Sequence, residues 1–205
     1  GRLPLQLPGW LEALLAATSG AGSATAPTAP ADSAVTHRVI ASSAIALAGC
    51  EAAAARRFDH VVRHDRRVDG PVGDAASEIV GTLRRGPPGI YLWGGETTLQ
   101  LPPDPGRGGR CQQLALRCAL ELAGRAGLAV LCGATDGSDE PGEDAGGLVD
   151  DRTIARAEAE GLSGAACLAA ADAGRFLAAA GDLISTGPTG TNVNDLVVGL
   201  RAAAG

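Results

Sequence analysis

The sequence contains no lysine and no methionine, so arginine supplies all 17 of its basic side chains. The absence of lysine excludes a Schiff-base lysine and the lysine of a phosphate-binding GxxxxGK[ST] loop. Aromatic residues make up only 2% of the chain, which leaves few ring platforms for bases or sugars. Because the chain lacks a methionine and starts at Gly1, we expect it to be part of a longer polypeptide.

Other shortages narrow the function further. The net charge of −6 argues against binding to nucleic acid or to an anionic membrane. No apolar run is long enough for a membrane span. The cysteines are odd in number and form no CxxC pair, so they predict core residues in a reducing compartment rather than a zinc site or a disulfide framework. They are Cys50, Cys111, Cys118, Cys132 and Cys167. We therefore expect a cytoplasmic protein.

A chain of 205 residues suits one domain, or one domain and a remnant of another. We interpret residues 1–35 as the end of a helix (10–17) and a flexible linker (19–34), the remnant of an upstream domain. Residues 36–88 are predicted to form a βαβα segment that joins the domains, and residues 89–205 an α/β domain.

Strands and helices alternate along the predicted domain. We expect strands at 38–42, 60–63, 89–93, 128–134, 183–185 and from Leu196 onward. Helices are expected at 43–57, at 74–85 with Asp74 as its cap, from about 113 to 123, and from Asp151 and Asp172. The pattern predicts an α/β fold whose sheet of mixed or mostly parallel strands is flanked by helices. Ligand loops are expected at the strand ends.

Two glycine-rich segments are candidates for ligand binding. The first, "WGGETT", places Gly94, Gly95, Glu96 and Thr97 after a strand, where paired glycines allow a ligand to approach the backbone. The second, "GRGGRCQQ", places Arg110 after Gly108 and Gly109 at the start of a helix. A helix N-terminus beside a guanidinium suits an anion. The alternatives are a plain turn and a solvated arginine, the state that we expect for Arg107.

Two further loops are polar. The loop "ATDGSDEPGED" follows a buried strand, and Asp136 is its best candidate for holding Mg²⁺, whereas Glu140, Glu143 and Asp144 are expected to be solvated. The loop "TGPTGTN" is richer than a turn requires and resembles a cradle for phosphate or carboxylate. Its candidate contacts are Thr186, Gly187, Thr189, Gly190, Thr191, Asn192 and Asn194.

His60 and His64 are four residues apart, but neighbouring arginines would repel a metal, so we expect a solvated basic edge. No GxSxG elbow is present, and no cysteine has a context that suggests a nucleophile.

Taken in order and spacing, "GGETT", "GRGGRCQQLAL", "TDGSDEPGEDAGGLVD" and "TGPTGTNVNDL" resemble the MOFRL domain. This domain is the C-terminal half of glycerate 2-kinases that are often labelled hydroxypyruvate reductases. The resemblance covers Gly89 to Leu200 and implies phosphorylation of D-glycerate to 2-phosphoglycerate with ATP and Mg²⁺, in a cleft between two α/β domains. It also implies an upstream domain with a catalytic lysine.

The chain departs from the family pattern at three places. GGRNQE is replaced by a segment with Cys111 and Gln113, an NDSY-like stretch by residues 171–174, and a GSN-like element by residues 41–43. Arg110 is retained. The changes at Cys111 and Gln113 leave open a degenerate domain that binds a small acid without catalysis.

Under the kinase hypothesis, Arg110 would neutralise the glycerate carboxylate or the moving phosphoryl group, and Asp136 would orient substrate or metal-bound water. Gly95, Arg110, Asp136 and Thr189 should then line one cleft. The alternative is an NAD(P)H-dependent hydroxypyruvate reductase, although no GxGxxG motif follows a strand. Either enzyme would act on a small molecule, and a homodimer is compatible with the sequence.

Overall fold

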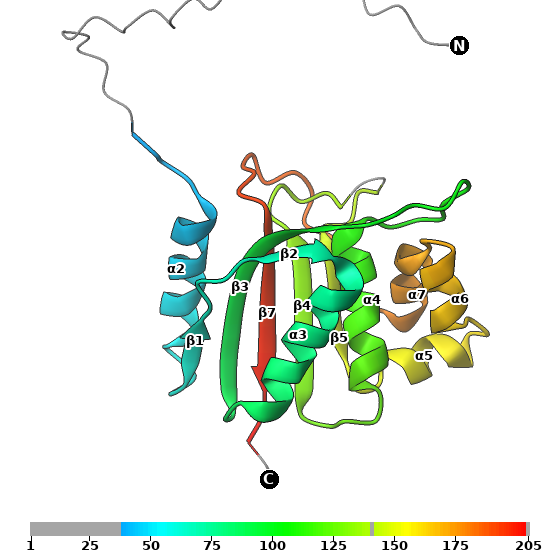
Figure 1. Ribbon diagram of the computed structural model, residues 1–205, viewed down its shortest axis with the longest axis horizontal. Helices are drawn as coiled ribbons and strands as arrows, with labels where there is room; N and C mark the ends of the chain where they lie inside the picture. Colours follow the sequence, from blue (N-terminus) through cyan, green and yellow to red (C-terminus); the bar gives the residue numbers. More distant parts are fainter. Residues whose placement is uncertain (1–37, 140–141, 204–205) are drawn as a thin grey trace, which may run out of the picture. The chain divides into compact units, whose positions relative to one another are not determined.

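Seven strands form one sheet in the computed structural model of the protein, which describes residues 38–139 and 142–203. Their order is β1-β3-β7-β4-β5-β6, and β2 pairs with β3 on the same side as β1 (Figure 1). The strands are β1 (Val61–Arg63), β2 (Val68–Pro71), β3 (Gly89–Thr98), β4 (Leu128–Ala134), β5 (Gly146–Asp150), β6 (Leu183–Ile184) and β7 (Asp195–Arg201). The predicted helix end at 10–17 and linker at 19–34 lie outside the described residues.

The sheet is mixed, as the sequence predicts. β1 and β2 are parallel to β3, whereas β7 is antiparallel to both of its neighbours, β3 and β4. β5 is antiparallel to β4 and to β6. The register places Asp195, the first residue of β7, beside Gly95 and Ala134. The start of β7 therefore lies at the same end of the sheet as the last residues of β3 and β4.

Helices cover both faces of the sheet, but unequally. One face carries α3 (Val72–Arg85), α4 (Arg110–Leu122), α5 (Thr153–Ala159), α6 (Gly164–Ala169) and α7 (Ala173–Ala180), and the other carries α2 (Ser43–Ala54). Alternation along β3 explains the two cores, because Tyr91 and Trp93 join the larger one while Ile90 and Leu92 pack with Leu47 of α2. None of the helices that the structure describes has the length and apolar composition needed to cross a bilayer.

Several predicted elements form, and one does not. The helix predicted from Ser43 and the strands predicted at 60–63 and 128–134 are confirmed within a few residues. The strand predicted at 38–42 is wrong, since Val39 and Ile40 are 74% and 83% exposed and none of the described strands pairs with them. Ser42 instead caps α2 by accepting a hydrogen bond from the backbone N–H of Ile45.

The "GGETT" segment is strand rather than loop. β3 continues to Thr98 because β2 and β7 pair with its second half. The sequence also missed β5, which follows directly on the acidic loop, and the short helix α6. Helix α3 begins at Val72, two residues before the predicted cap, because Pro71 has the φ of −60° that suits entry into a helix. Asp74 therefore lies in the first turn rather than at the cap position.

The two histidines belong to an aromatic cluster rather than to a solvated edge, so that prediction is wrong. The ring of His64 stacks on Trp93 with centroids 4.7 Å apart, and His60 meets Tyr91 edge-on at 5.9 Å. The Nε2 atoms of both histidines are buried and have no hydrogen-bond partner among the described residues. Burial lowers the pKa of His64, so its ring is neutral near pH 7 and packs as an apolar group.

The contact of β2 with β3 depends on Gly95, and this gives a test of the fold. A Cβ atom at Gly95 would lie 2.0 Å from the backbone oxygen of Val68. We expect Gly95→Ala to lower the free energy of unfolding by about 1–3 kcal/mol, because the two strands must separate. The matched control is Gly49→Ala in α2, where a Cβ meets nothing within 4 Å and should stabilise the helix by about 0.5–1 kcal/mol. Urea denaturation measures both, and equal effects would contradict the close approach.

Candidate active site

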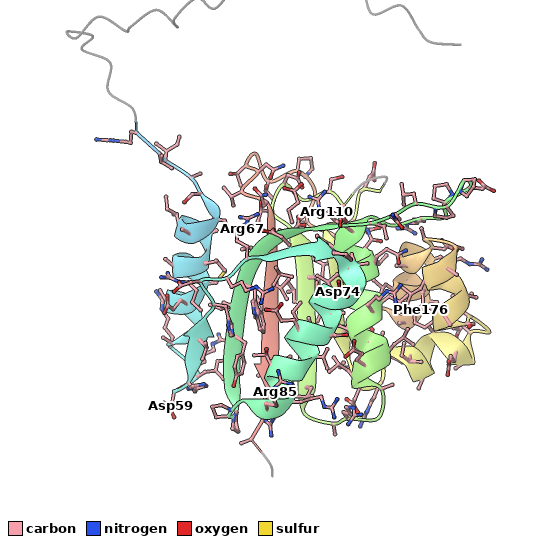
Figure 2. The ribbon with its side chains drawn as sticks, viewed as in Figure 1. Asp59, Arg67, Asp74, Arg85, Arg110 and Phe176 are labelled. Carbon is pink, nitrogen blue, oxygen red and sulfur yellow. The ribbon has the colours of Figure 1, made fainter. Side chains whose placement is uncertain are left out.

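An open cavity of about 920 Å³ lies at the edge of the sheet where β3 ends. Residues from β2, β3, the start of α4 and the loops before β5 and β7 line it. Its charged lining consists of four carboxylates and two guanidinium groups: Asp69, Glu96, Asp136, Asp139, Arg67 and Arg110. Figure 2 shows Arg67 and Arg110 at this end of the sheet. Segments that lie far apart in the sequence meet here, with a surplus of negative charge.

The four residues expected in one cleft divide into two pairs. Arg110 and Asp136 line the cavity, whereas Gly95 and Thr189 do not. Gly95 lies within β3 against Val68. The backbone N–H of Thr189 donates a hydrogen bond to the carbonyl of Asp136 at 3.0 Å, so Thr189 supports a lining residue without lining the cavity itself. The other predicted contacts that reach the cavity are Glu96, Thr97, Gly108, Gly109 and Asn192.

Arg110 opens α4, as predicted, and its guanidinium is held by carboxylates of the protein itself. Its Nε donates to Oδ2 of Asp195 at 2.7 Å, and its Nη2 donates to Oδ1 of the same residue at 3.2 Å. Nη2 also lies 3.5 Å from Oε1 of Glu96. The hydrogen bonds that Arg110 donates to Asp195, whose side chain is 8% exposed, raise the pKa of Arg110 above its ordinary value. The arginine is fixed in place, and only Nη1 has no hydrogen bond to the described residues.

Glu96 is itself positioned from two sides. Its Oε2 accepts a hydrogen bond from the side chain of Asn194 at 2.6 Å, and its backbone N–H donates to Asp69 at 2.9 Å. Asn194 has a φ of +70°, an unusual conformation for a residue other than glycine. It is stabilised by hydrogen bonds from Thr135 to its carbonyl, at 3.3 Å from the backbone and 2.7 Å from the hydroxyl. The turn into β7 thus aims an amide at the strand β3.

The N-terminus of α4 already holds a carboxylate, which changes the predicted anion site. Asp139 accepts hydrogen bonds from the backbone N–H groups of Cys111 at 3.0 Å and Gln112 at 2.8 Å. These groups are therefore not free to join Arg110 around an external anion. Asp139 is only 3% exposed, and burial raises its pKa to about 6 despite these two bonds.

Asp136 links the acidic loop to the polar loop before β7. Its Oδ1 accepts a hydrogen bond from the backbone N–H of Ser138 at 3.2 Å, and its Oδ2 accepts one from the amide of Asn192 at 2.9 Å. Asp136 and Ser138 also line a second cavity of about 590 Å³, together with Ser185 and Gly187. Two cavities therefore share one wall, and the oxygens of Asp136 lie within it.

The remaining polar groups of the loop mostly bind the protein itself. The hydroxyl of Thr189 donates to the carbonyl of Thr135 at 2.5 Å, and that of Thr186 donates to the carbonyl of Gly187 at 2.9 Å. Gly187 and Gly190 have φ values of +67° and +75°, so they serve the turn. Thr191 is exposed. The loop is consequently a structured wall rather than a row of free donors.

Asp144 is buried, contrary to the sequence prediction, whereas Arg107 is exposed as predicted but is held in an ion pair. The guanidinium of Arg107 forms an ion pair with Asp144, which also accepts a hydrogen bond from the hydroxyl of Ser185. These bonds, with that of Ser185 the strongest, lower the pKa of Asp144. Glu143 is exposed as expected, and Glu140 lies outside the described residues.

Two of the residues that depart from the family pattern, Cys111 and Gln113, do not line the cavity. The side chains of Cys111, Gln112 and Gln113 are buried. Oε1 of Gln112 and Nε2 of Gln113 have no hydrogen-bond partner among the described residues. An unpartnered buried amide is costly, so the replacement at Gln113 weakens the support of α4 rather than removing a group from the cavity.

Sequence reasoning missed Asp195 and the pair Arg67–Asp69. Asp195 directly precedes the apolar run of β7. A buried carboxylate at such a position needs a cation as its partner, and in the structure that partner is Arg110. Asp69 lies in β2, which the sequence did not identify as a strand, and Arg67 directly precedes it. The described residues contain no group of three or more His, Cys, Asp and Glu side chains that could hold a metal ion.

Comparison with known proteins assigns the greater part of this site to one family. The model of the MOFRL family matches residues 89–195. A D-glycerate 2-kinase of Thermotoga maritima is 42% identical over 113 residues, which are 55% of this chain and 27% of the relative. A human glycerate kinase is 46% identical over 115 residues, or 53% of this chain and 22% of the relative. A protein of Agrobacterium vitis with the provisional name hydroxypyruvate reductase is 36% identical over 170 residues, or 78% and 44%.

Two crystal structures share the fold. A glycerate kinase from Thermotoga maritima superposes with a TM-score of 0.73 and 31% identity, over 78% of this chain and 41% of that one. A protein from Pyrococcus horikoshii superposes with a TM-score of 0.75 and 30% identity, over 83% and 41%. The chain thus spans less than half the length of each of these relatives.

The raised pKa of Asp139 predicts a dependence of stability on pH. An aspartate in an unfolded chain titrates near pH 3.9, so the folded state binds the extra proton between about pH 4 and 6. The stability that protonation provides is complete below about pH 4 and is lost as the pH rises through 6. Relative to Asp139→Asn, which cannot ionise, the wild-type free energy of unfolding should fall by about 1–3 kcal/mol between pH 4 and 7.

Urea denaturation at several pH values measures this difference. Glu143→Gln is the matched control, since it removes an exposed carboxylate of the same loop and should show no such trend. A constant difference between wild type and Asp139→Asn would show that Asp139 titrates as an ordinary carboxyl.

Proposed function

The chain belongs to the MOFRL family, and from this premise we propose that it forms part of the active site of an ATP-dependent glycerate 2-kinase. The reaction would convert D-glycerate to 2-phosphoglycerate. The names of the relatives from Thermotoga maritima and human support this assignment. The single observation that carries it is the fixed guanidinium of Arg110 at the rim of the larger cavity.

Phosphoryl transfer depends chiefly on positioning and on neutralisation of charge, and Arg110 is suited to both. Asp195 and Glu96 hold two of its nitrogens, so its orientation does not depend on substrate. Nη1 is left for the carboxylate of glycerate or for the moving phosphoryl group. Gly108 and Gly109 line the cavity beside it and leave room for that group.

The cavity needs more positive charge than this chain supplies. Four carboxylates and two guanidinium groups line it, so a free anion would be repelled. We propose that Mg²⁺ and a cation from beyond this chain, the catalytic lysine of an upstream domain, supply the remainder. Asp136 fits Mg²⁺ that arrives with the phosphates of ATP, a mode that needs only one or two carboxylates. When bound there, the ion would neutralise charge on the phosphates.

The two cavities on either side of Asp136 give each ligand a place. The larger, beside Arg110, suits glycerate and the reacting phosphate, and the smaller, beside Ser185 and Gly187, suits the rest of the nucleotide phosphates. Asn192 fixes the carboxylate of Asp136 between them. The polar loop therefore acts on the ligands mainly by holding this wall.

The proposal predicts that this chain alone is inactive. Because the lining lacks lysine and carries excess negative charge, the purified 205-residue chain should phosphorylate D-glycerate no faster than a blank with ATP and Mg²⁺. A coupled assay that detects the formation of 2-phosphoglycerate measures this activity. Robust turnover by this chain would show that no residue from elsewhere is needed.

Substitution of Arg110 tests the assignment in a full-length enzyme that contains this chain. An arginine that meets the charge of a transferring phosphoryl group contributes about 10³–10⁵ to the rate. We expect Arg110→Ala to lower kcat/KM at least about a hundredfold, and Arg110→Lys to recover only part of it, because an ammonium cannot form the bidentate pair with Asp195.

The matched control is Arg117→Ala, which removes an exposed arginine from the same helix. Thermal unfolding of each variant separates a loss of activity from a loss of fold. If the variants at Arg110 and Arg117 have equal activity, Arg110 is an ordinary surface charge.

A hydroxypyruvate reductase is the second candidate, favoured by the name of the relative from Agrobacterium vitis. The same preparation is assayed for oxidation of NADH with hydroxypyruvate. Turnover in that assay, without phosphorylation of D-glycerate, would replace the kinase proposal. Inactivity in both assays with retained glycerate binding would indicate a degenerate binding domain, which the unpartnered amide of Gln113 would explain.

A further inference from the structure

Three arginines line a pocket of about 440 Å³ at the end of the sheet opposite to the candidate active site. Arg84 comes from the last turn of α3, Arg125 from the connection between α4 and β4, and Arg201 from the end of β7. The other lining residues are proline, glycine, alanine and leucine, so no carboxylate faces these three cations in the lining. In a chain with a net charge of −6, this is a local reversal of charge.

Two of the three guanidinium groups are anchored without being neutralised. Nη1 of Arg201 donates to the backbone carbonyl of Leu83 at 2.8 Å and to that of Arg84. Nε of Arg125 donates to the carbonyl of Glu121 at 3.1 Å. These carbonyls orient the side chains but carry no formal charge. The other nitrogens of both groups form no hydrogen bond or ion pair with the described residues.

The carboxylate best placed to neutralise Arg125 is engaged elsewhere. Glu121 lies four residues before Arg125 and accepts the hydrogen bond of Arg125 through its backbone carbonyl rather than through its carboxylate. Its Oε1 instead accepts a hydrogen bond from the hydroxyl of Ser77 in α3, at 2.8 Å. The structure therefore keeps the positive charge of Arg125 available to the pocket.

We propose that Arg84, Arg125 and Arg201 form a second anion site, which binds a small molecule that carries two or more phosphoryl groups. Guanidinium groups pair with phosphate oxygens through parallel hydrogen bonds, and three of them match a diphosphate or triphosphate better than a single carboxylate. The lining contains no aromatic ring, so phosphates rather than a base would supply the recognition.

This site is distinct from the candidate active site and does not depend on the proposed kinase activity. β4 spans seven residues between the two ends of the sheet, which corresponds to about 20 Å. Figure 2 shows Arg85, the neighbour of Arg84, at one end and Arg110 at the other.

Isothermal titration calorimetry with pyrophosphate, without Mg²⁺, tests the proposal on the 205-residue chain. We expect saturable binding by the wild type. The double variant Arg84→Gln/Arg125→Gln should bind at least about tenfold more weakly, because two charge-assisted contacts are lost from a partly solvated site. Arg201 is left intact because it supports the end of α3.

The matched control is Arg85→Gln/Arg117→Gln, which changes the net charge equally at exposed positions outside the pocket lining. It should change the affinity less than about threefold. Arg110→Ala should retain binding, which separates this pocket from the active-site cavity. Circular dichroism verifies that every variant is folded. Equal weakening in both double variants, loss of binding in Arg110→Ala, or no binding by the wild type would each overturn the proposal.

Discussion

The ion pair between Arg110 and Asp195 joins the start of α4 to the central strand of the sheet, and the geometry of the candidate site depends on it. Asp195 is the first residue of β7, which runs antiparallel between β3 and β4. Asp195 therefore lies beside the last residue of β4 and three residues before the end of β3. Arg110 is held at that point, and the preceding glycines are carried to the cavity with it. The pairing register of β3, β7 and β4 therefore determines, through this ion pair, where the side chain of Arg110 lies.

Carboxylates of the protein occupy the places that the sequence offered to an external anion. Asp139 takes up the N–H groups at the start of α4, and Asp195 takes up two nitrogens of Arg110. These contacts make the site rigid, but they leave fewer groups to bind an anion that arrives without a cation. Such a site discriminates by the charge that a ligand brings with it, since a phosphate accompanied by a divalent cation is repelled less than the same phosphate alone.

Local sequence patterns predicted many of the helices and strands. The features that they did not predict depend on pairing between segments that are far apart in the sequence. The apolar run at 128–134 and the glycines before Arg110 identified β4 and the start of α4. The sequence read "GGETT" as a loop, because glycine and threonine beside an acid are typical of turns, whereas β2 and β7 hold it as strand. Asp144 was expected in solvent because nothing local showed that Arg107, 37 residues away, would pair with it. Asp195 was missed for the same reason, since its partner lies 85 residues earlier.

The position of β7 in the chain has a consequence for biosynthesis. It leaves the ribosome after every other strand that the structure describes, yet both of its edges are paired, with β3 and with β4 (Figure 1). Until residues 195–201 emerge, the sheet lacks its middle, and the facing edges of β3 and β4 have no strand between them. Unpaired strand edges invite association with other chains. A nascent chain that stops short of Asp195 would therefore lose the centre of its sheet rather than an edge strand, and the sheet cannot be completed until residues 195–201 have emerged.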